Sequence, residues 1–293
     1  MNTPKVSIIT VNYKQKEVTA DLLRSILLSG YPNLEVILVD NESDGSDETF
    51  YCSHYPGLRY LYSPENVGFA GGNNLGIQAS TGEYLFFLNN DTEISSGLIE
   101  HLLEGFADHQ VGAVSPVIRY AENPARIQFA GYTAIHPLTG RNSPLRQLPT
   151  ESWSESPYFH GAAVLISRKV IEQAGVMPEE YFLYYEELDW SEKIRKNGFQ
   201  ILVAREVSII HKESISTGKN SPLKVYYQTR NRIRFMKENS SLYGLFLSFF
   251  LLVSFPKNLL RLPEKHRNAF WLGCKDALVR KQFGWKNPVY FRA

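Results

Sequence analysis

Three carboxylates lie within four residues near the middle of the chain, directly after a run of aromatic side chains. The segment is Tyr181-Phe-Leu-Tyr-Tyr-Glu-Glu-Leu-Asp-Trp190. At a helix start the macrodipole lowers the pKa of Glu187, whereas burial among aromatic rings and repulsion from Glu186 raise it. A general base needs such opposed influences. The preference of acidic residues for helix N-termini explains one carboxylate but not the aromatic setting, so we predict a catalytic base at Glu187, with Glu186 as the alternative.

A second polar group, Asn89-Asn90-Asp91, directly follows an apolar run. Mg²⁺ and Mn²⁺ prefer hard oxygen ligands and bridge to substrate phosphates, so a carboxylate beside amide oxygens suits them. The same residues also favour a plain polar turn before a helix. His211 ends a later apolar run, where a histidine is either an ordinary polar residue or a metal ligand.

A glycine-rich segment, Ser63-Pro-Glu-Asn-Val-Gly-Phe-Ala-Gly-Gly-Asn-Asn74, precedes a helical pattern. Gly68, Gly71 and Gly72 would let the backbone approach a ligand closely, and the helix start offers free N–H groups. The segment lacks the Lys-Ser/Thr of a Walker A loop and the spacing of a dinucleotide fingerprint. A glycine turn with a purely structural role is the alternative.

These groups need a scaffold, and the first half of the chain alternates strand and helix patterns. Apolar and β-branched runs predict strands at Val6–Asn12, Leu34–Asp40, Leu58–Tyr62 and Tyr84–Leu88. Between the first two strands apolar residues recur at helical spacing until Gly30, and another helix is expected at residues 70–79. This alternation predicts an α/β fold with a mostly parallel, Rossmann-like sheet and helices on both faces.

Ligands of such sheets bind beyond the carboxyl ends of the strands, so Asn12, Asp40 and Asp91 should share one crevice. Residues 119–157 show no period and predict a long loop or hairpin region, a candidate part of an acceptor site. Two further strands are expected at 158–167 and 201–210, around a helix from Glu186 to Asn197.

Five of these segments together resemble a known family. In order and spacing they are similar to family-2 glycosyltransferases of the GT-A fold, in the bacterial rhamnosyltransferase and galactofuranosyltransferase-like branch, over roughly residues 5–240. The segments are Val6-Ser-Ile-Ile-Thr-Val-Asn-Tyr13, Val39-Asp-Asn41, Glu65-Asn-Val-Gly-Phe-Ala-Gly-Gly-Asn-Asn-Leu-Gly76, Phe87-Leu-Asn-Asn-Asp91 and Tyr185-Glu-Glu-Leu-Asp-Trp190.

The resemblance implies roles for individual residues. It implies a nucleotide and diphosphate pocket formed by Thr10, Asn12, Asp40, Asn66, Gly68 and Asn90. It implies that Asp91 is the last acidic residue of the metal motif, that His211 completes coordination of Mn²⁺ or Mg²⁺, and that Glu187 is the base. The first position of the metal motif is Asn89 rather than Asp, which removes one charge.

The implied reaction moves rhamnose, galactose, galactofuranose or glucose from a TDP or UDP donor to an acceptor hydroxyl, with inversion, in cell-surface polysaccharide or glycan synthesis. The acceptor is expected to be a glycan or a lipid-linked glycan. A sugar nucleotidyltransferase is the alternative enzyme, although the first turn lacks the glycine-rich basic loop that binds triphosphate. The other alternative is a non-catalytic, membrane-associated binding protein on the same fold.

The end of the chain is basic: residues 224–293 hold 14 Lys/Arg against 3 Asp/Glu, although the whole chain has a net charge of +1. We place a domain boundary near 220, with a catalytic domain at 1–220 and a basic amphipathic helical extension at 221–293. The apolar run Leu242–Phe255 lies between basic clusters, with Trp271 and Trp285 after it. At 14 residues this run is shorter than a membrane span, which favours a helix on an anionic membrane surface and outside the catalytic core.

Composition sets the remaining expectations. Two cysteines, Cys52 and Cys274, cannot build a disulfide framework, and the short apolar N-terminus is read as a strand rather than a signal peptide. We therefore expect a cytoplasmic protein on the inner face of the cell membrane. No nucleic-acid-binding motif is recognised, so nucleic acid is not an expected partner. Packing of Leu242–Phe255 on the core or on a second copy in a homodimer is left open.

Overall fold

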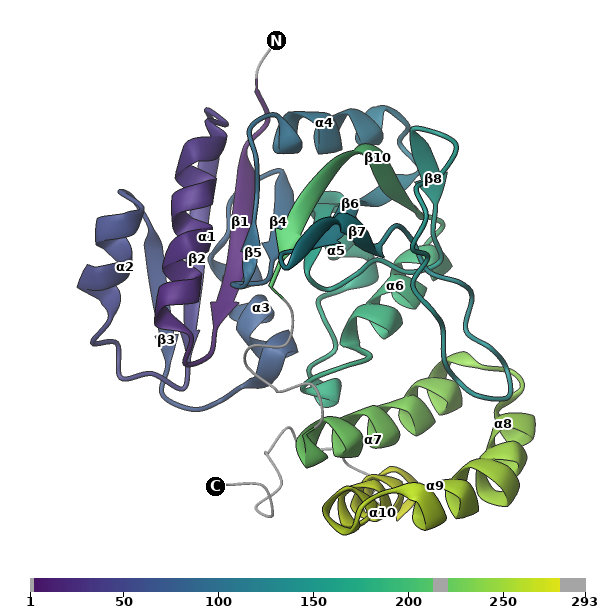
Figure 1. The fold of residues 1–293 in the computed structure, drawn as a ribbon. Coiled ribbons are helices and arrows are strands. Elements are labelled where there is room, and N and C mark those ends of the chain that lie inside the picture. Colours follow the sequence, from purple (N-terminus) through teal and green to yellow (C-terminus); the bar gives the residue numbers. More distant parts are fainter. Residues whose placement is uncertain (1–2, 213–220, 280–293) are drawn as a thin grey trace.

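The computed structural model describes residues 3–212 and 221–279, and a large mixed sheet lies at the centre of the fold (Figure 1). The strands pair in the order β3-β2-β1-β4-β9-β6-β10-β5, with β7 on β6 and β8 on β10. Their bounds are β1 Val6–Asn12, β2 Leu34–Asn41, β3 Arg59–Ser63, β4 Tyr84–Leu88, β5 Thr92–Glu93, β6 Val111–Tyr120, β7 Asn123–Phe129, β8 Trp153–Glu155, β9 Ala163–Ser167 and β10 Gln200–His211.

Helices cover both faces of this sheet. One apolar core lies under α1 and α4, and a second lies under α3, α5 and α6. The helical bounds are α1 Lys16–Ser29, α2 Glu48–His54, α3 Gly68–Ala79, α4 Leu98–Glu104, α5 Arg168–Ala174, α6 Glu186–Lys196, α7 Pro222–Asn239, α8 Tyr243–Phe249, η3 Phe250–Ser254, α9 Phe255–Arg261 and α10 Glu264–Val279, with short turns η1 Gly105–Ala107 and η2 Glu179–Tyr181.

The predicted α/β architecture is confirmed, and its sheet has two different parts. β3, β2, β1 and β4 are parallel neighbours, as the alternation of strand and helix predicts. β9 then pairs antiparallel with both β4 and β6, and β10 returns parallel to β6. The predicted strand at 158–167 begins only at Ala163, because residues 156–162 leave the sheet to form a loop. The expected irregular region 119–157 contains the β6–β7 hairpin and β8.

The glycine-rich segment packs α3 against β1 more than it opens space for a ligand. A Cβ at Gly72 would lie 2.7 Å from the Val11 side chain, and one at Gly76 would lie 2.3 Å from that of Ile9. The expectation that Gly72 lets the backbone approach a ligand is therefore wrong, since the side of the glycine where a Cβ would project contacts the sheet. Close helix–strand packing brings the N-terminus of α3 to the carboxyl end of β1.

The C-terminal helices α7 to α10 group at one end of the sheet, drawn green to yellow in Figure 1. α8, η3 and α9 run as one helix from Tyr243 to Arg261, 19 residues that are long and apolar enough to cross a membrane by length and composition alone. Phe246 and Phe250 on this helix are buried in a third apolar core with α7 and α10. The rest of its apolar surface is mostly exposed. The helix extends beyond the 14-residue run seen in the sequence, so the argument that the run is too short to span was wrong.

The division of the chain at 220 stays a prediction, but α7 contacts residues that belong to the candidate site. Ile233 and Phe235 pack with Tyr181 and Leu188. Sequence reasoning placed everything after about 220 outside the catalytic core, whereas α7 is joined to the acidic segment by a shared apolar cluster. Trp285 lies outside the described residues.

Candidate active site

Asp91 and His211 meet because a two-residue strand ties their two segments together. β5 follows Asp91 directly and pairs antiparallel with the end of β10, with His211 opposite Thr92. The backbone N–H of Lys212 also donates to the Asp91 carbonyl at 2.9 Å. Asp91 Oδ1 and His211 Nε2 lie 3.1 Å apart, and both side chains are buried. The two predicted metal ligands are thus neighbours.

The chemistry of these groups fits a divalent cation. Asn89 Oδ1 is buried without a hydrogen-bond partner, and the buried Asp91 Oδ1 has a ring nitrogen, His211 Nε2, as its close polar neighbour. His211 Nδ1 lies 2.8 Å from Gln128 Oε1. As the donor in this bond, Nδ1–H leaves the Nε2 lone pair directed toward Asp91, the arrangement of a metal-binding imidazole.

The protein alone offers few ligands at this place. Within residues 3–212 and 221–279, no cluster of three His, Cys, Asp or Glu side chains is placed to hold a metal. Mg²⁺ and Mn²⁺ often take several ligands from substrate phosphates and water, so two protein ligands are compatible with such a site. His160 is nearby, with its ring centroid 6.0 Å from that of His211. Burial lowers the pKa of His160 to about 3, which keeps this imidazole neutral.

Asn12, Asp40 and Asn90 form one buried polar network at the carboxyl ends of β1, β2 and β4. Asn12 Nδ2 donates to Asp40 Oδ1 at 2.7 Å and to the Tyr51 hydroxyl at 3.1 Å. Asp40 Oδ2 accepts from the Tyr60 hydroxyl at 2.7 Å. Asn90 Nδ2 donates to Asn12 Oδ1 at 3.3 Å. The strand ends thus bring Asn12 and Asp40 together as predicted, but the third member of the network is Asn90 and not Asp91, whose side chain pairs with His211 instead. The polar atoms of the network are largely occupied by each other.

The other residues predicted to bind the nucleotide, Thr10, Asn66 and Gly68, lie outside this network and differ in their contacts. Thr10 is fully buried, and its hydroxyl has no hydrogen-bond partner. Asn66 Oδ1 accepts from Asn41 Nδ2 at 3.1 Å and from the Gly68 N–H at 2.9 Å. Gly68 has φ +77°, and a Cβ there would lie 2.6 Å from the Phe182 carbonyl oxygen. The close approach at Gly68 is therefore to the aromatic segment that carries the carboxylates.

That aromatic segment has an unusual backbone. Phe182, Tyr184 and Tyr185 have φ values of 65°, 68° and 76°, a left-handed conformation that large side chains rarely adopt. Each such residue costs on the order of 1–3 kcal/mol and persists only where the surroundings enforce it. Glu186 begins α6 immediately after these three residues. Strain of this kind clusters at functional sites.

Side chains of α7 hold this segment in its left-handed conformation. Asn231 is fully buried, and its Nδ2 lies 2.9, 2.8 and 2.7 Å from the carbonyl oxygens of Tyr181, Leu183 and Tyr184. Arg230 on the same helix donates to the Tyr181 carbonyl at 2.8 Å. Backbone carbonyls turned out of regular structure need such partners when buried. Sequence reasoning missed these two residues, because their helix was assigned to a separate module.

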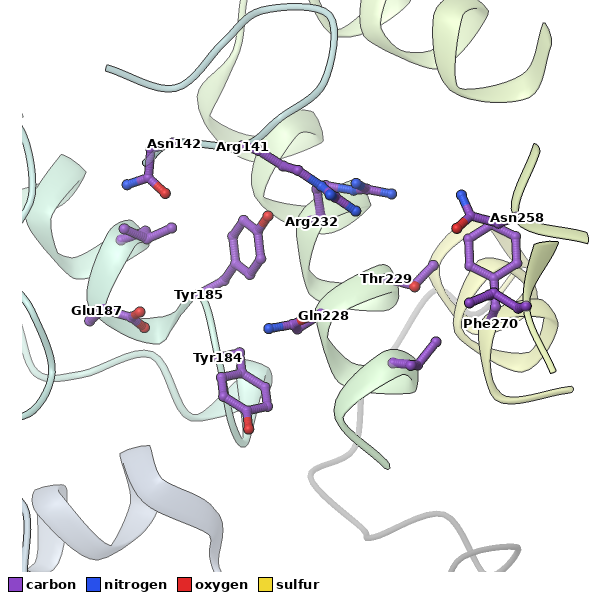
Figure 2. Close-up of a pocket in the computed structure, with 13 residues that line it drawn as sticks. Arg141, Asn142, Tyr184, Tyr185, Glu187, Gln228, Thr229, Arg232, Asn258 and Phe270 are labelled. Carbon is purple, nitrogen blue, oxygen red and sulfur yellow. The ribbon is translucent and has the colours of Figure 1, made fainter. Parts of the chain in front are cut away.

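Glu187 lies on the wall of a cavity of about 410 Å³ between this segment and the C-terminal helices (Figure 2). It is the only acidic side chain among the described residues that line this cavity, and its buried Oε2 has no hydrogen-bond partner. Burial raises the pKa of Glu187 to about 7. Burial, and then the neighbouring Glu187, raise the pKa of Glu186 well above its ordinary value. Glu186 is buried and does not line the cavity.

The structure therefore brings the predicted site residues together in three groups: Asp91 with His211, the network of Asn12, Asp40 and Asn90, and Glu187 in its own cavity. Gln128 and His160 were missed. A histidine in the loop before β9 and a glutamine in β7 carry no joint signal in the sequence.

Comparisons with known proteins identify the family of this chain. The model of glycosyl transferase family 2 matches residues 7–175. A hexosyltransferase of low-salt glycan biosynthesis from Haloferax volcanii is 32% identical over 80% of this chain and 76% of its own length. The N-acetylglucosaminyl-diphospho-decaprenol L-rhamnosyltransferase of Mycobacterium tuberculosis is 25% identical over 74% of this chain and 79% of its own length.

Solved structures agree on the fold. A mannosyltransferase from Pyrobaculum calidifontis, in complex with GDP-Man and Mn²⁺, matches with a TM-score of 0.62 at 16% identity, covering 96% of this chain and 89% of that one. Residues 1–349 of S. aureus TarS, in complex with UDP-GlcNAc, match with a TM-score of 0.63 at 16% identity, covering 93% and 80%. The predicted GT-A fold and enzyme class are confirmed, and the sugar nucleotidyltransferase alternative finds no support. The chain belongs to glycosyltransferase family 2.

Proposed function

We propose that this enzyme is an inverting hexosyltransferase of cell-surface glycan synthesis, with Glu187 as its general base. The proposed donor is a TDP- or UDP-linked rhamnose, galactose, galactofuranose or glucose, and the acceptor is a hydroxyl of a glycan or lipid-linked glycan. The proposal rests on the surroundings of Glu187. It is the single acidic residue among the described residues that line the cavity, its pKa is raised to about 7, and its buried Oε2 has no hydrogen-bond partner.

A base of this kind suits a single displacement. With a pKa near 7, Glu187 is partly ionised at neutral pH and can accept the proton of an acceptor hydroxyl at its free Oε2. Attack of that oxygen on the anomeric carbon opposite the diphosphate inverts the configuration in one step. A two-step retaining route on the glycosidase pattern needs a second carboxylate as nucleophile. Glu186, the nearest in sequence, does not line the cavity.

Asp91 and His211 are the proposed ligands of Mn²⁺ or Mg²⁺. The proposal is supported by the close approach of Asp91 Oδ1 and His211 Nε2, by the buried and unpartnered Asn89 Oδ1, and by the Gln128 contact. A bound divalent cation supplies neutralisation of the charge that develops on the diphosphate leaving group. Asp91 and His211 would fix where that diphosphate lies relative to the sugar. The polar network at Asn12 and Asp40 is proposed to border the nucleoside, with Thr10, Asn66, Gly68 and Asn90 beside it.

Calorimetry of UDP and TDP binding, with and without Mn²⁺, tests the metal assignment. We expect Asp91→Ala to abolish the effect of the metal on nucleotide affinity while the protein stays folded. Asp108→Ala is the control, because Asp108 is exposed in the turn before β6, where its Oδ1 accepts from the Gln110 N–H. An unchanged metal effect in Asp91→Ala would contradict the assignment.

The enzyme is further proposed to work at the cytoplasmic face of the membrane, held by the basic C-terminal region and the apolar helix of Tyr243–Arg261. Only 11% of that helix's apolar window is buried in the protein, and Leu252 and Leu260 are 78% and 85% exposed. Burial of one Leu side chain contributes about 1.5–3 kcal/mol, and each basic residue near an anionic leaflet about 1 kcal/mol. A surface of this composition suits an anionic lipid interface.

Co-sedimentation of the full chain with vesicles tests this placement. Leu252→Asp with Leu260→Asp should reduce binding to vesicles that contain phosphatidylglycerol by about tenfold or more. Leu28→Asp is the control, because Leu28 on α1 is also 80% exposed but lies far from this helix in the sequence. Binding that ignores lipid charge, or that survives the double substitution, would refute it.

A further inference from the structure

One arginine in the cavity beside Glu187 forms no ion pair with a carboxylate of the described residues. Arg232 on α7 is only 5% exposed, and its Nε has no hydrogen-bond partner. Burial lowers the pKa of Arg232 to about 10, and the other groups that act on it are Tyr185, Arg141 and Cys274, none of them a carboxylate. Its one described aromatic contact is with Phe250, 5.3 Å from the guanidinium to the ring centroid.

A second arginine faces the same space from a different part of the chain. Arg141 lies on the turn after Gly140, and Figure 2 shows its guanidinium beside that of Arg232 on the cavity wall. The Tyr185 hydroxyl donates to the Gly140 carbonyl at 2.9 Å, which ties this turn to the strained segment. Two like charges are thus held together at one end of a cavity, with Glu187 on the other side of Tyr185.

Such an arrangement is costly for the protein by itself. A buried charge without a counter-ion is disfavoured, and a second like charge beside it adds repulsion. Guanidinium groups match phosphate oxygens in shape and charge, and a pair of them matches a dianion. We propose that Arg232 and Arg141 bind a phosphate group of the acceptor, which places its hydroxyl at Glu187.

The cavity has the position and size for such an acceptor. Its described lining includes neither Asp91 nor His211, so the arginine pair is separate from the proposed donor diphosphate site. About 410 Å³ lies within the usual range of small-ligand pockets and accommodates a sugar with its phosphate. The acceptor class is therefore a sugar linked through phosphate, either soluble or attached to lipid. This inference deepens the proposed function and rests on Glu187 as the base.

Calorimetry with the full chain tests the pair directly, without turnover. Glucose 1-phosphate is compared with glucose, and farnesyl diphosphate with farnesol, so that soluble and lipid-linked sources of phosphate are separated. We expect at least one phosphorylated probe to bind about tenfold or more tightly than its unphosphorylated partner, and Arg232→Met to remove that preference. Arg141→Gln should weaken it to a smaller extent, because Arg141 is more exposed.

Lys237→Gln is the matched control, since it removes one positive charge from an exposed position of the same helix. Arg232→Met should melt no lower than the wild type, because it removes an unpaired buried charge and keeps the length of the chain. A lower melting temperature with an unchanged phosphate preference would assign Arg232 a structural role and overturn the proposal.

Two further outcomes also overturn it. One is equal binding of glucose 1-phosphate and glucuronate, which would reduce the pair to a general anion site. The other is displacement of the probe by saturating UDP with Mn²⁺, which would make the pair part of the donor site. If the protein binds no nucleoside diphosphate at all, the proposed function fails while the phosphate preference still stands or falls by its own measurement.

Discussion

Two buried polar regions of the molecule differ in hydrogen bonding: the groups at the ends of β1 and β2 are paired, whereas those around Glu187 are not. Asn12 and Asp40 use their polar atoms on each other and on two tyrosine hydroxyls. Glu187 and Arg232 keep buried atoms without partners, next to three residues of strained backbone. Buried networks that are fully satisfied stiffen a protein, whereas unsatisfied buried groups cost stability. We therefore expect the first region to act as a rigid support and the second to bind a ligand with its unpartnered groups.

The largest effect is expected from a substitution in the second region, at Glu187, and concerns turnover. Glu187→Gln keeps the size of the side chain but cannot accept a proton, so turnover should fall on the order of a hundredfold or more while donor affinity stays nearly unchanged. Steady-state kinetics with separate measurement of donor binding checks this. Glu186→Gln is the matched comparison. If Glu186→Gln is the inactive variant instead, the base has been assigned to the wrong member of the pair.

A substitution in the first region should lower the unfolding free energy of the protein. Asn12→Ala removes the donor to Asp40 Oδ1 and leaves a buried carboxylate oxygen unpaired, which should cost about 2 kcal/mol of unfolding free energy. Denaturant unfolding gives this value. Asn33→Ala makes the same change at an exposed position, and its effect should be small. Lost nucleotide affinity with unchanged stability would show that the network acts first on the ligand.

The pH dependence of turnover should follow the ionisation of Glu187. Its pKa is raised to about 7, so below that pH the base is increasingly protonated and the rate should fall up to tenfold per pH unit. The same raised pKa makes ionisation unfavourable in the folded protein, so this group's contribution to stability is lost as pH rises through about 7. Glu187→Gln should therefore gain melting temperature relative to the wild type as the pH rises from about 6 to about 8, roughly one unit on either side of the pKa. A rate that does not change across pH 7 would contradict the assignment.

The smallest expected effect concerns the support of the strained segment. Asn231→Ala frees the carbonyls of Tyr181, Leu183 and Tyr184, so turnover should fall several-fold and unfolding free energy by about 1 kcal/mol or more. Lys237→Ala, at an exposed position of the same helix, is the control for helix stability. Equal loss of turnover in both variants would mean that α7 acts through general packing.

These differences also explain what the sequence could predict. The strand end at Asn12 and the helix start at Glu186 follow from local periodicity, and the structure has them where expected. The second strand ends at Asn41, one residue after the predicted Asp40. The meeting of Asp91 with His211 depends on β5, a strand of two residues that no periodicity reveals. The left-handed backbone at Tyr184 and Tyr185 contradicts local preference, and the residue that stabilises it, Asn231, lies more than 40 positions later in the chain.

The helix α9 borders both the cavity that holds Glu187 and the exposed apolar surface, and this has a further consequence. Asn258 and Leu262, four residues apart, line the cavity that holds Glu187, while Leu260 between them faces outward and is 85% exposed. With the proposed membrane placement, the wall of the acceptor cavity is also the part of the enzyme nearest the lipid. A lipid-linked acceptor then reaches Glu187 by lateral diffusion within the leaflet, so the encounter is a search in two dimensions rather than three. Its rate should depend on the surface density of the acceptor more than on its concentration in bulk.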